Sequence, residues 1–198
     1  MVDFHYTTQG EDIILTLKTP ITAIGTLHKM ITVIYSLEWD ILSGDIRTLV
    51  EDGREFSFDM LRIRKSSKKS KASASELALL MDTVFSPEND LQDIVKKIES
   101  KRPEPKSYFR SRSELIFEDD IAKNATVFYI ETENARGLLY YLTKVLRDYR
   151  IDIRDATIET DPYTQIAKDT FYLRDSSGNL FGKLPLAEEV RQKILKPL

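Results

Sequence analysis

An internal repeat limits the fold of this chain more than any other feature of its sequence. When the sequence is compared with itself at an offset of 112 residues, identical residues align without a gap: Gly25 with Gly137, Leu27 with Leu139, Val33 with Val145, Asp40 with Asp152, Ile46 with Ile158 and Thr48 with Thr160. Polar and apolar positions agree over the same window. A repeat of this length predicts one structural unit that is present twice in the chain.

Both halves show the same order of patterns. Residues 12–18 and 125–131 are β-branched and aromatic runs of strand length. Each run leads through a polar connection, which ends in Gly25 or Gly137, to apolar residues at helical spacing. Extended stretches over 39–50 and 151–160 follow, then a turn, then returning strands over 55–64 and 166–174. The alternation over 151–160 is interrupted, which predicts a bulge or bend.

The ends of the halves differ. The second half continues into a short strand over 179–183 and a helix that begins at Pro185. The first half continues into a helix over 75–85 and a further helix, for which Ser86 is the expected N-cap and Pro87 the first residue. This pattern predicts an α+β fold of two ferredoxin-like βαββαβ units in tandem, with antiparallel sheets and helices on one face. We expect a first domain over 1–100, a linker over 101–113 with Pro103 and Pro105, and a second domain over 114–198.

Composition argues against an enzyme. The chain has no Cys and only two His, so cysteine nucleophiles, thiolate metal sites and three-histidine sites are excluded. The formal charge is -3, which gives no general basicity for nucleic acid. The N-terminal residues do not read as a secretory signal, and no apolar run approaches the roughly 18 residues of a membrane span. We therefore expect a cytoplasmic, non-enzymatic protein without catalytic residues, metal, cofactor or membrane contact.

The second half resembles an ACT domain, and specifically the C-terminal ACT domains of bacterial PII uridylyltransferases. The resemblance covers residues 114–195 and rests on the lead-in at 114–119, on the loop and helix start at 134–139, on 151–153 and on 169–173. Two positions depart from the family loop, which has Asp and Pro where this chain has Asn134 and Arg136. The first half is a weaker match, and no uridylyltransferase catalytic motif accompanies the pair.

The resemblance implies small-molecule binding, often of amino acids, at the loop before each helix. In the second half the implied ligand-binding residues are Asn134, Ala135, Arg136, Gly137 and Leu138, and in the first half they are Thr22, Gly25 and Thr26. A helix N-terminus also favours an anion such as a carboxylate on physical grounds. Two structural alternatives remain open: Asn134 can be an ordinary N-cap of the helix, and the first loop can be a degenerate copy.

The leading hypothesis is a regulatory protein that binds an amino acid and is linked to nitrogen or amino-acid metabolism. The main alternative is a protein–protein interaction module with a vestigial ligand site, which acts on a partner enzyme in trans. We also expect the ACT units to pair side by side and the chain to form a homodimer. A third hypothesis, RNA binding through the basic run at 62–71, lacks the aromatic motif or Gly-x-x-Gly clamp of RNA-binding folds, so a nucleic-acid partner is not expected.

Overall fold

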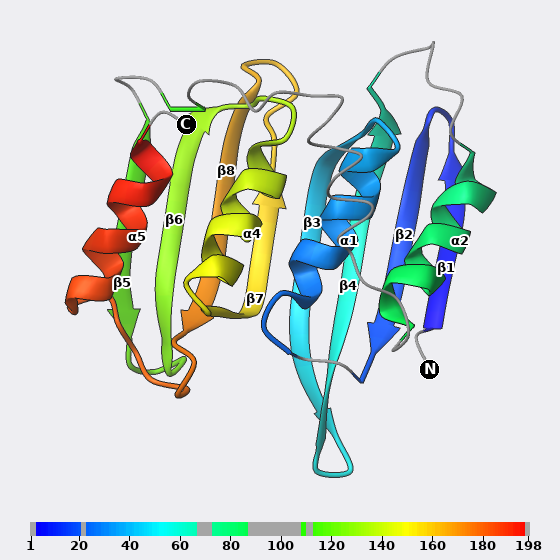
Figure 1. Ribbon diagram of the computed structural model, residues 1–198. Helices are drawn as coiled ribbons and strands as arrows, with labels where there is room; N and C mark the ends of the chain where they lie inside the picture. The colour runs from blue at the N-terminus through cyan, green and yellow to red at the C-terminus, as the bar shows by residue number, and fades with distance from the viewer. Residues whose placement is uncertain (1–2, 21–22, 67–72, 87–107, 110–112, 197–198) are drawn as a thin grey trace.

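The described part of the protein is an α+β fold with one antiparallel sheet of eight strands and four helices on one face of that sheet (Figure 1). The structure is a computed structural model that describes residues 3–20, 23–66, 73–86, 108–109 and 113–196. In chain order the elements are β1 (Asp3–Gln9), β2 (Asp12–Thr19), α1 (Thr26–Ser36), β3 (Trp39–Glu51), β4 (Arg54–Lys65), α2 (Ala74–Phe85), β5 (Glu114–Asp120), β6 (Ala125–Glu133), α4 (Leu138–Asp148), β7 (Asp152–Glu159), β8 (Ile166–Arg174) and α5 (Pro185–Leu195).

The strand order shows how the two halves meet. It is β1-β2-β4-β3-β7-β8-β6-β5, so β1 to α2 form a first unit and β5 to α5 a second unit. The units join where β3 pairs antiparallel with β7, in a register that sets Gly44 opposite Ile158. An edge strand of one unit thereby continues the sheet of the other, and Figure 1 shows α1 and α4 side by side over this junction.

The order of elements within a unit corrects one prediction. Each unit is built as ββαββα rather than βαββαβ. Residues 179–183, which we expected to form a closing strand, are not a strand. The place beside the central strand is instead taken by an N-terminal hairpin partner, β1 in the first unit and β5 in the second. The sequence pattern shows which segments have strand length. It does not decide whether the N-terminal or the C-terminal segment of a unit pairs at the edge of the sheet.

Other predicted elements are confirmed. A bulge interrupts β7 between Ile153 and Asp155, and an equivalent one interrupts β3 between Ile41 and Ser43. Helix α2 begins after Ser73, whose side chain accepts a hydrogen bond from the Glu76 amide. Several predictions lie outside the described residues: the helix beginning at Pro87, most of the linker with Pro103 and Pro105, Thr22, and the lysines at 68, 69 and 71.

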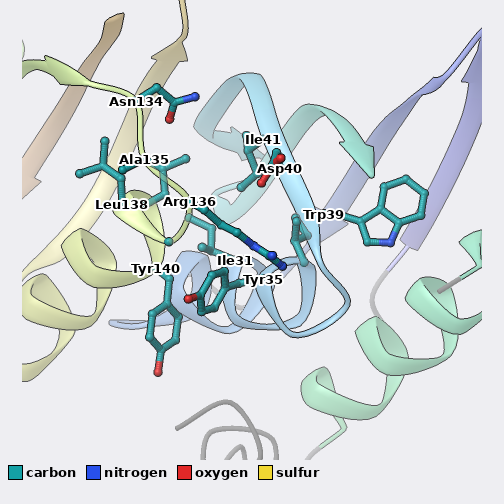
Figure 2. A pocket seen from close by; sticks show the side chains of 13 residues that line it. Ile31, Tyr35, Trp39, Asp40, Ile41, Asn134, Ala135, Arg136, Leu138 and Tyr140 are labelled. Carbon is teal, nitrogen blue, oxygen red and sulfur yellow. The ribbon is translucent and has the colours of Figure 1, made fainter. Parts of the chain in front are cut away.

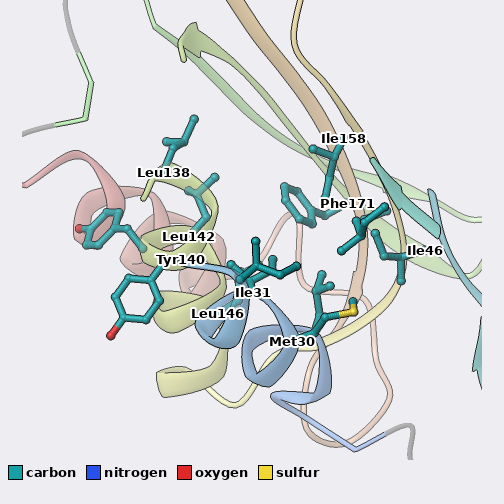
Figure 3. Close-up of a cluster of buried hydrophobic side chains, with 14 of the residues drawn as sticks. Met30, Ile31, Ile46, Leu138, Tyr140, Leu142, Leu146, Ile158 and Phe171 are labelled. Atoms are coloured by element: carbon teal, nitrogen blue, oxygen red, sulfur yellow. The ribbon is translucent and has the colours of Figure 1, made fainter. Parts of the chain in front are cut away.

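The core lies between the sheet and the helices and runs through both units without a break. Figure 3 shows Met30 and Ile31 of α1 near Leu142 and Leu146 of α4, with Ile46 of β3 alongside. These five side chains are at most 3% exposed. Because this packing is shared, the relative position of the two units is fixed by apolar burial as well as by the β3–β7 ladder.

Candidate functional site

The predicted ligand loop of the second unit lines a cavity of about 120 Å³ between the units (Figure 2). Residues 134–140 form one wall, and the end of α1 with the start of β3, from the first unit, forms the other. The described structure thus brings Asn134, Ala135, Arg136, Gly137 and Leu138 together at one site. A complete site requires both units.

Gly137 allows the backbone of this loop to turn into α4. It has a φ of 86°, which side-chain-bearing residues rarely adopt, and it is the N-cap of the helix. A Cβ atom at this position would lie 2.8 Å from the Tyr108 hydroxyl oxygen and 3.0 Å from that of Tyr35.

No side chain caps the helix α4. Asn134 is therefore not its N-cap, which corrects that structural alternative. The Asn134 side chain has no hydrogen bond to any residue in the described ranges.

Arg136 supplies the positive charge of the cavity. Its guanidinium lies 5.8 Å from the centre of the Tyr35 ring, across the junction between the units, and Figure 2 shows it extending over that ring. Within the described residues no carboxylate pairs with Arg136. An arginine held by an aromatic face keeps its five N–H donors for another acceptor.

The start of α4 also faces the cavity. The amides of Leu139 and Tyr140 lie in the first turn of α4, before the first hydrogen bond within that helix, which the Tyr141 amide donates to the Gly137 carbonyl.

A row of aromatic rings leads from the cavity into the contact between α1 and α4. The Tyr35 ring stacks on Tyr140 with centroids 5.0 Å apart, and Tyr140 contacts His28 at 5.3 Å. Tyr140 and His28 occupy equivalent positions in the two units, 112 residues apart. Arg136 at the cavity is therefore connected through three rings to the centre of the contact between the units.

His28 is neutral at this position. It is 1% exposed, and burial lowers its pKa to about 3, with Arg147 and Lys144 adding to the shift. The Thr143 hydroxyl donates to the Leu139 carbonyl at 2.7 Å, so it accepts from the Nδ1–H of His28 at 3.0 Å. A neutral, fully packed histidine at this place is a structural element of the junction rather than a base or a metal ligand.

The first unit has an equivalent but much smaller cavity, of about 20 Å³. Gly25 (φ 90°) and Thr26 lie on one side of it and Asp152 of the second unit on the other. A Cβ on Gly25 would meet Arg147, which lies 112 residues after Tyr35 in the repeat. Of the predicted first-unit residues, Gly25 and Thr26 are thus beside this cavity, and its size leaves room for about one water.

Each unit holds one buried aspartate on the helix-covered face of its sheet. Asp59 lies opposite Ile46. Asp169 accepts a hydrogen bond from the Glu159 amide, next to Ile158, which is the equivalent of Ile46 in the repeat. The two acids therefore have corresponding positions. They are 2% and 0% exposed, and burial raises the pKa of each to about 7. Asp59 accepts a hydrogen bond from Ser57 and lines the small cavity.

Tyr35, Asp40 and Ile41 are among the lining residues that we did not predict. They belong to the first unit and lie more than 90 residues from the loop that they face. The internal repeat held one signal from which the place of Asp40 could have been predicted. Asp40 aligns with Asp152, and Asp152 in turn faces the first loop.

The basic run, metal ligands and membrane-spanning helices were the other features considered as functional from the sequence. Arg62 and Arg64, at the start of the basic run, both hold the buried carboxylate of Asp12 and lower its pKa. In the ranges that the structure describes, no cluster of three or more His, Asp or Glu side chains could hold a metal ion. No helix of those ranges has the length and apolarity to span a membrane.

Comparisons with known proteins relate part of this chain to one enzyme family. No protein-family model matches the sequence. The chain is 23% identical, over 139 residues, to a bifunctional uridylyltransferase/uridylyl-removing enzyme of Rhodospirillum rubrum. That alignment covers 70% of this chain but only 15% of the enzyme, and it supports a relation to that enzyme family over part of the chain.

A crystal structure of an unknown protein from Galdieria sulphuraria aligns with 92% of this chain and 88% of its own. The sequence identity is 14% and the TM-score is 0.27, which establishes no common fold.

Proposed function

We propose that this protein is a non-enzymatic regulatory protein of two ACT-type units, which binds an amino acid in the cavity between them. The observation that carries the proposal is the cavity itself, because the predicted loop of one unit and the wall supplied by the other meet there. The ACT assignment rests on the sequence resemblance over residues 114–195, and the alignment with a uridylyltransferase supports a relation to that enzyme family alone. The activity of those enzymes is not transferred, since the alignment covers so little of their length.

The polar groups of the cavity suit a ligand carboxylate. Arg136 offers a guanidinium that lies over the Tyr35 ring and that no acid of the described residues engages, and the first turn of α4 adds the positive end of its dipole. Asp40, on the opposite wall, is an acceptor for a ligand ammonium group. Ile31, Ile34 and Leu138 leave an apolar space between these charges for a side chain.

Binding at this place would act on the contact between the units. A ligand that touches both walls favours whichever packing of α1 against α4 brings those walls to the right separation. The row of rings from Arg136 through Tyr35 and Tyr140 to His28 is the physical connection by which occupancy alters that packing. A regulated partner would then recognise the changed surface.

A thermal-shift screen of the twenty amino acids tests this function. A ligand at 100 times its Kd adds about 2.7 kcal/mol to the stability of the folded state. We expect at least one amino acid to raise the melting temperature of the wild type and of Arg54→Gln, an exposed arginine away from the cavity. Arg136→Gln should lose that shift. A blank screen with well-folded protein rejects the proposal.

The interaction module is the second candidate, and one observation favours it. Tyr35 and Tyr108 lie so close to Gly137 that the loop backbone is already covered by protein atoms. A site closed in this way would be vestigial, and the protein would then act by contact with a partner enzyme. Capture of a stoichiometric partner together with a blank ligand screen supports this second function.

A further inference from the structure

The two outer edges of the sheet are not equivalent, although the units are. β5 forms one edge and buries Leu115 and Phe117 at 7% and 8% exposure. β1 forms the other, and six of its seven residues are exposed. An edge strand presents unpaired backbone N–H and C=O groups to which a further strand can pair. Each edge of the described sheet therefore needs protection against such pairing.

The β5 edge is protected by a side chain and by charge. Arg191 of α5 donates a hydrogen bond of 2.8 Å to the Leu115 carbonyl, and its guanidinium lies 5.8 Å from the centre of the Phe117 ring. Four of the seven residues of β5 are acidic. Two such strands would set carboxylates against one another, which is unfavourable for pairing.

The β1 edge lacks the arginine. The buried residues Leu77 and Met81 of α2 match Val190 and Ile194 of α5, which are also four residues apart. This match places Ala78 where the second unit has Arg191. No side chain of the described α2 therefore covers β1 in the way that Arg191 covers β5.

The β1 edge also lacks the charge. The hairpin registers set Tyr6 opposite Leu15 and Phe117 opposite Phe128, so Tyr6 is the equivalent of Phe117, but it is 41% exposed. Asp3 is the single acidic residue of β1, and it lies 2.9 Å from the ring of His5. The strand contains no Lys, Arg or Pro to hinder pairing.

We propose that β1 is the surface through which two copies of this chain pair, antiparallel and around a two-fold axis, to extend the sheet. The chain already joins its own units in this way, through antiparallel β3 and β7 with α1 against α4. An antiparallel strand pairs with a copy of itself without breaking symmetry. Because β5 is protected, the sheet of the described residues has one open edge, so pairing stops at a dimer and does not propagate into a fibre.

The molar mass in solution is the first test. We expect the wild type to have twice the chain mass of 22.9 kDa by light scattering, and to dissociate on dilution. Tyr6→Lys should give a monomer, and so should Ala78→Arg, which installs the arginine of the other edge. Ile116→Lys is the matched control, since Ile116 is 39% exposed on β5, and it should leave the dimer intact.

Three results of this experiment overturn the proposal. They are a wild type that is monomeric at every concentration, a dimer that survives both β1 variants, and a dimer that is lost in Ile116→Lys.

Disulfide trapping is the second test and does not depend on a destabilising change. The chain has no cysteine, so a single one reports only on its own position. Directly opposed antiparallel residues have Cα atoms about 4.5 to 5.5 Å apart, within the range of a disulfide. Among His5→Cys, Tyr6→Cys and Thr7→Cys, at least one should cross-link two chains on oxidation. Ile116→Cys should not, and cross-linking at Ile116 alone refutes the proposed surface.

Discussion

Asp169 permits a sharp test of the energetics of the fold, because it is a carboxyl group without exposure. It accepts one hydrogen bond, from the Glu159 amide at 3.2 Å, through Oδ1. Its Oδ2 is buried and has no partner among the described residues. Burial raises its pKa from 3.8 to about 7. Asparagine has nearly the same shape, keeps the acceptor oxygen and cannot ionise, so Asp169→Asn removes the charge and little else.

The sign and size of the effect follow from this pKa. The unfolded chain loses the Asp169 proton near the usual value of 3.8 and the folded chain near 7. The stability that the neutral carboxyl contributes is therefore present below about pH 4 and is lost as the pH rises through about 7. A difference of this size corresponds to at most about 4 kcal/mol. Asp169→Asn should therefore gain stability relative to the wild type as the pH rises.

Urea denaturation of both proteins between about pH 5 and about pH 8 measures this difference. Asp12→Asn is the matched control. Arg64 and Arg62 lower the pKa of Asp12 below its ordinary value of 3.8, so Asp12 is ionised in both the folded and the unfolded chain across this pH range. Asp12→Asn should therefore cost the same stability at every pH of the series. A constant difference between Asp169→Asn and the wild type across this range would refute the reasoning.

Two further predictions concern the junction and the loops. The wild type should lose up to about 5 kcal/mol of stability as the pH falls from about 7 to about 3, because unfolded His28 takes up a proton near its usual 6.5 while buried His28 has a pKa of about 3. In equilibrium unfolding, His28→Gln should reduce this loss of stability at acidic pH. A loss of the same size in His28→Gln would contradict the lowered pKa of His28. Gly137→Ala should cost about 1 to 2 kcal/mol more than Gly25→Ala, because a new methyl group meets two tyrosines at 2.8 and 3.0 Å rather than the flexible Arg147 chain at 3.2 Å. Equal melting temperatures for these two variants would contradict the packing argument.

The sequence allowed the two units to be predicted, but not every strand of either. The repeat and the apolar spacing identified α1 and α4 together with β2, β3, β4, β6, β7 and β8, since these signals are local. β1 was missed because an exposed edge strand has few apolar residues, as DFHYTTQ illustrates. The order βαββαβ was wrong because the choice of edge partner depends on long-range pairing.

The candidate site was predicted in part for the same reason. The loop at 134–138 was expected from its resemblance to the family loop and from Gly137, which permits close approach of a ligand. Gly137 has a φ of 86°. Tyr35 and Asp40 complete the cavity from the other unit. Their role depends on the β3–β7 junction, which no local pattern of residues specifies. The cavity is thus a property of how the units pack, and it becomes visible only in three dimensions.

Isothermal titration of the amino acid that gives the largest thermal shift tests the central claim most directly. The cavities of about 120 and about 20 Å³ predict one ligand per chain, bound between the units. We expect that stoichiometry for the wild type, with binding lost in Arg136→Gln and kept in Arg54→Gln. Two equal sites per chain, or binding that Arg136→Gln leaves unchanged, would contradict a single site between the units.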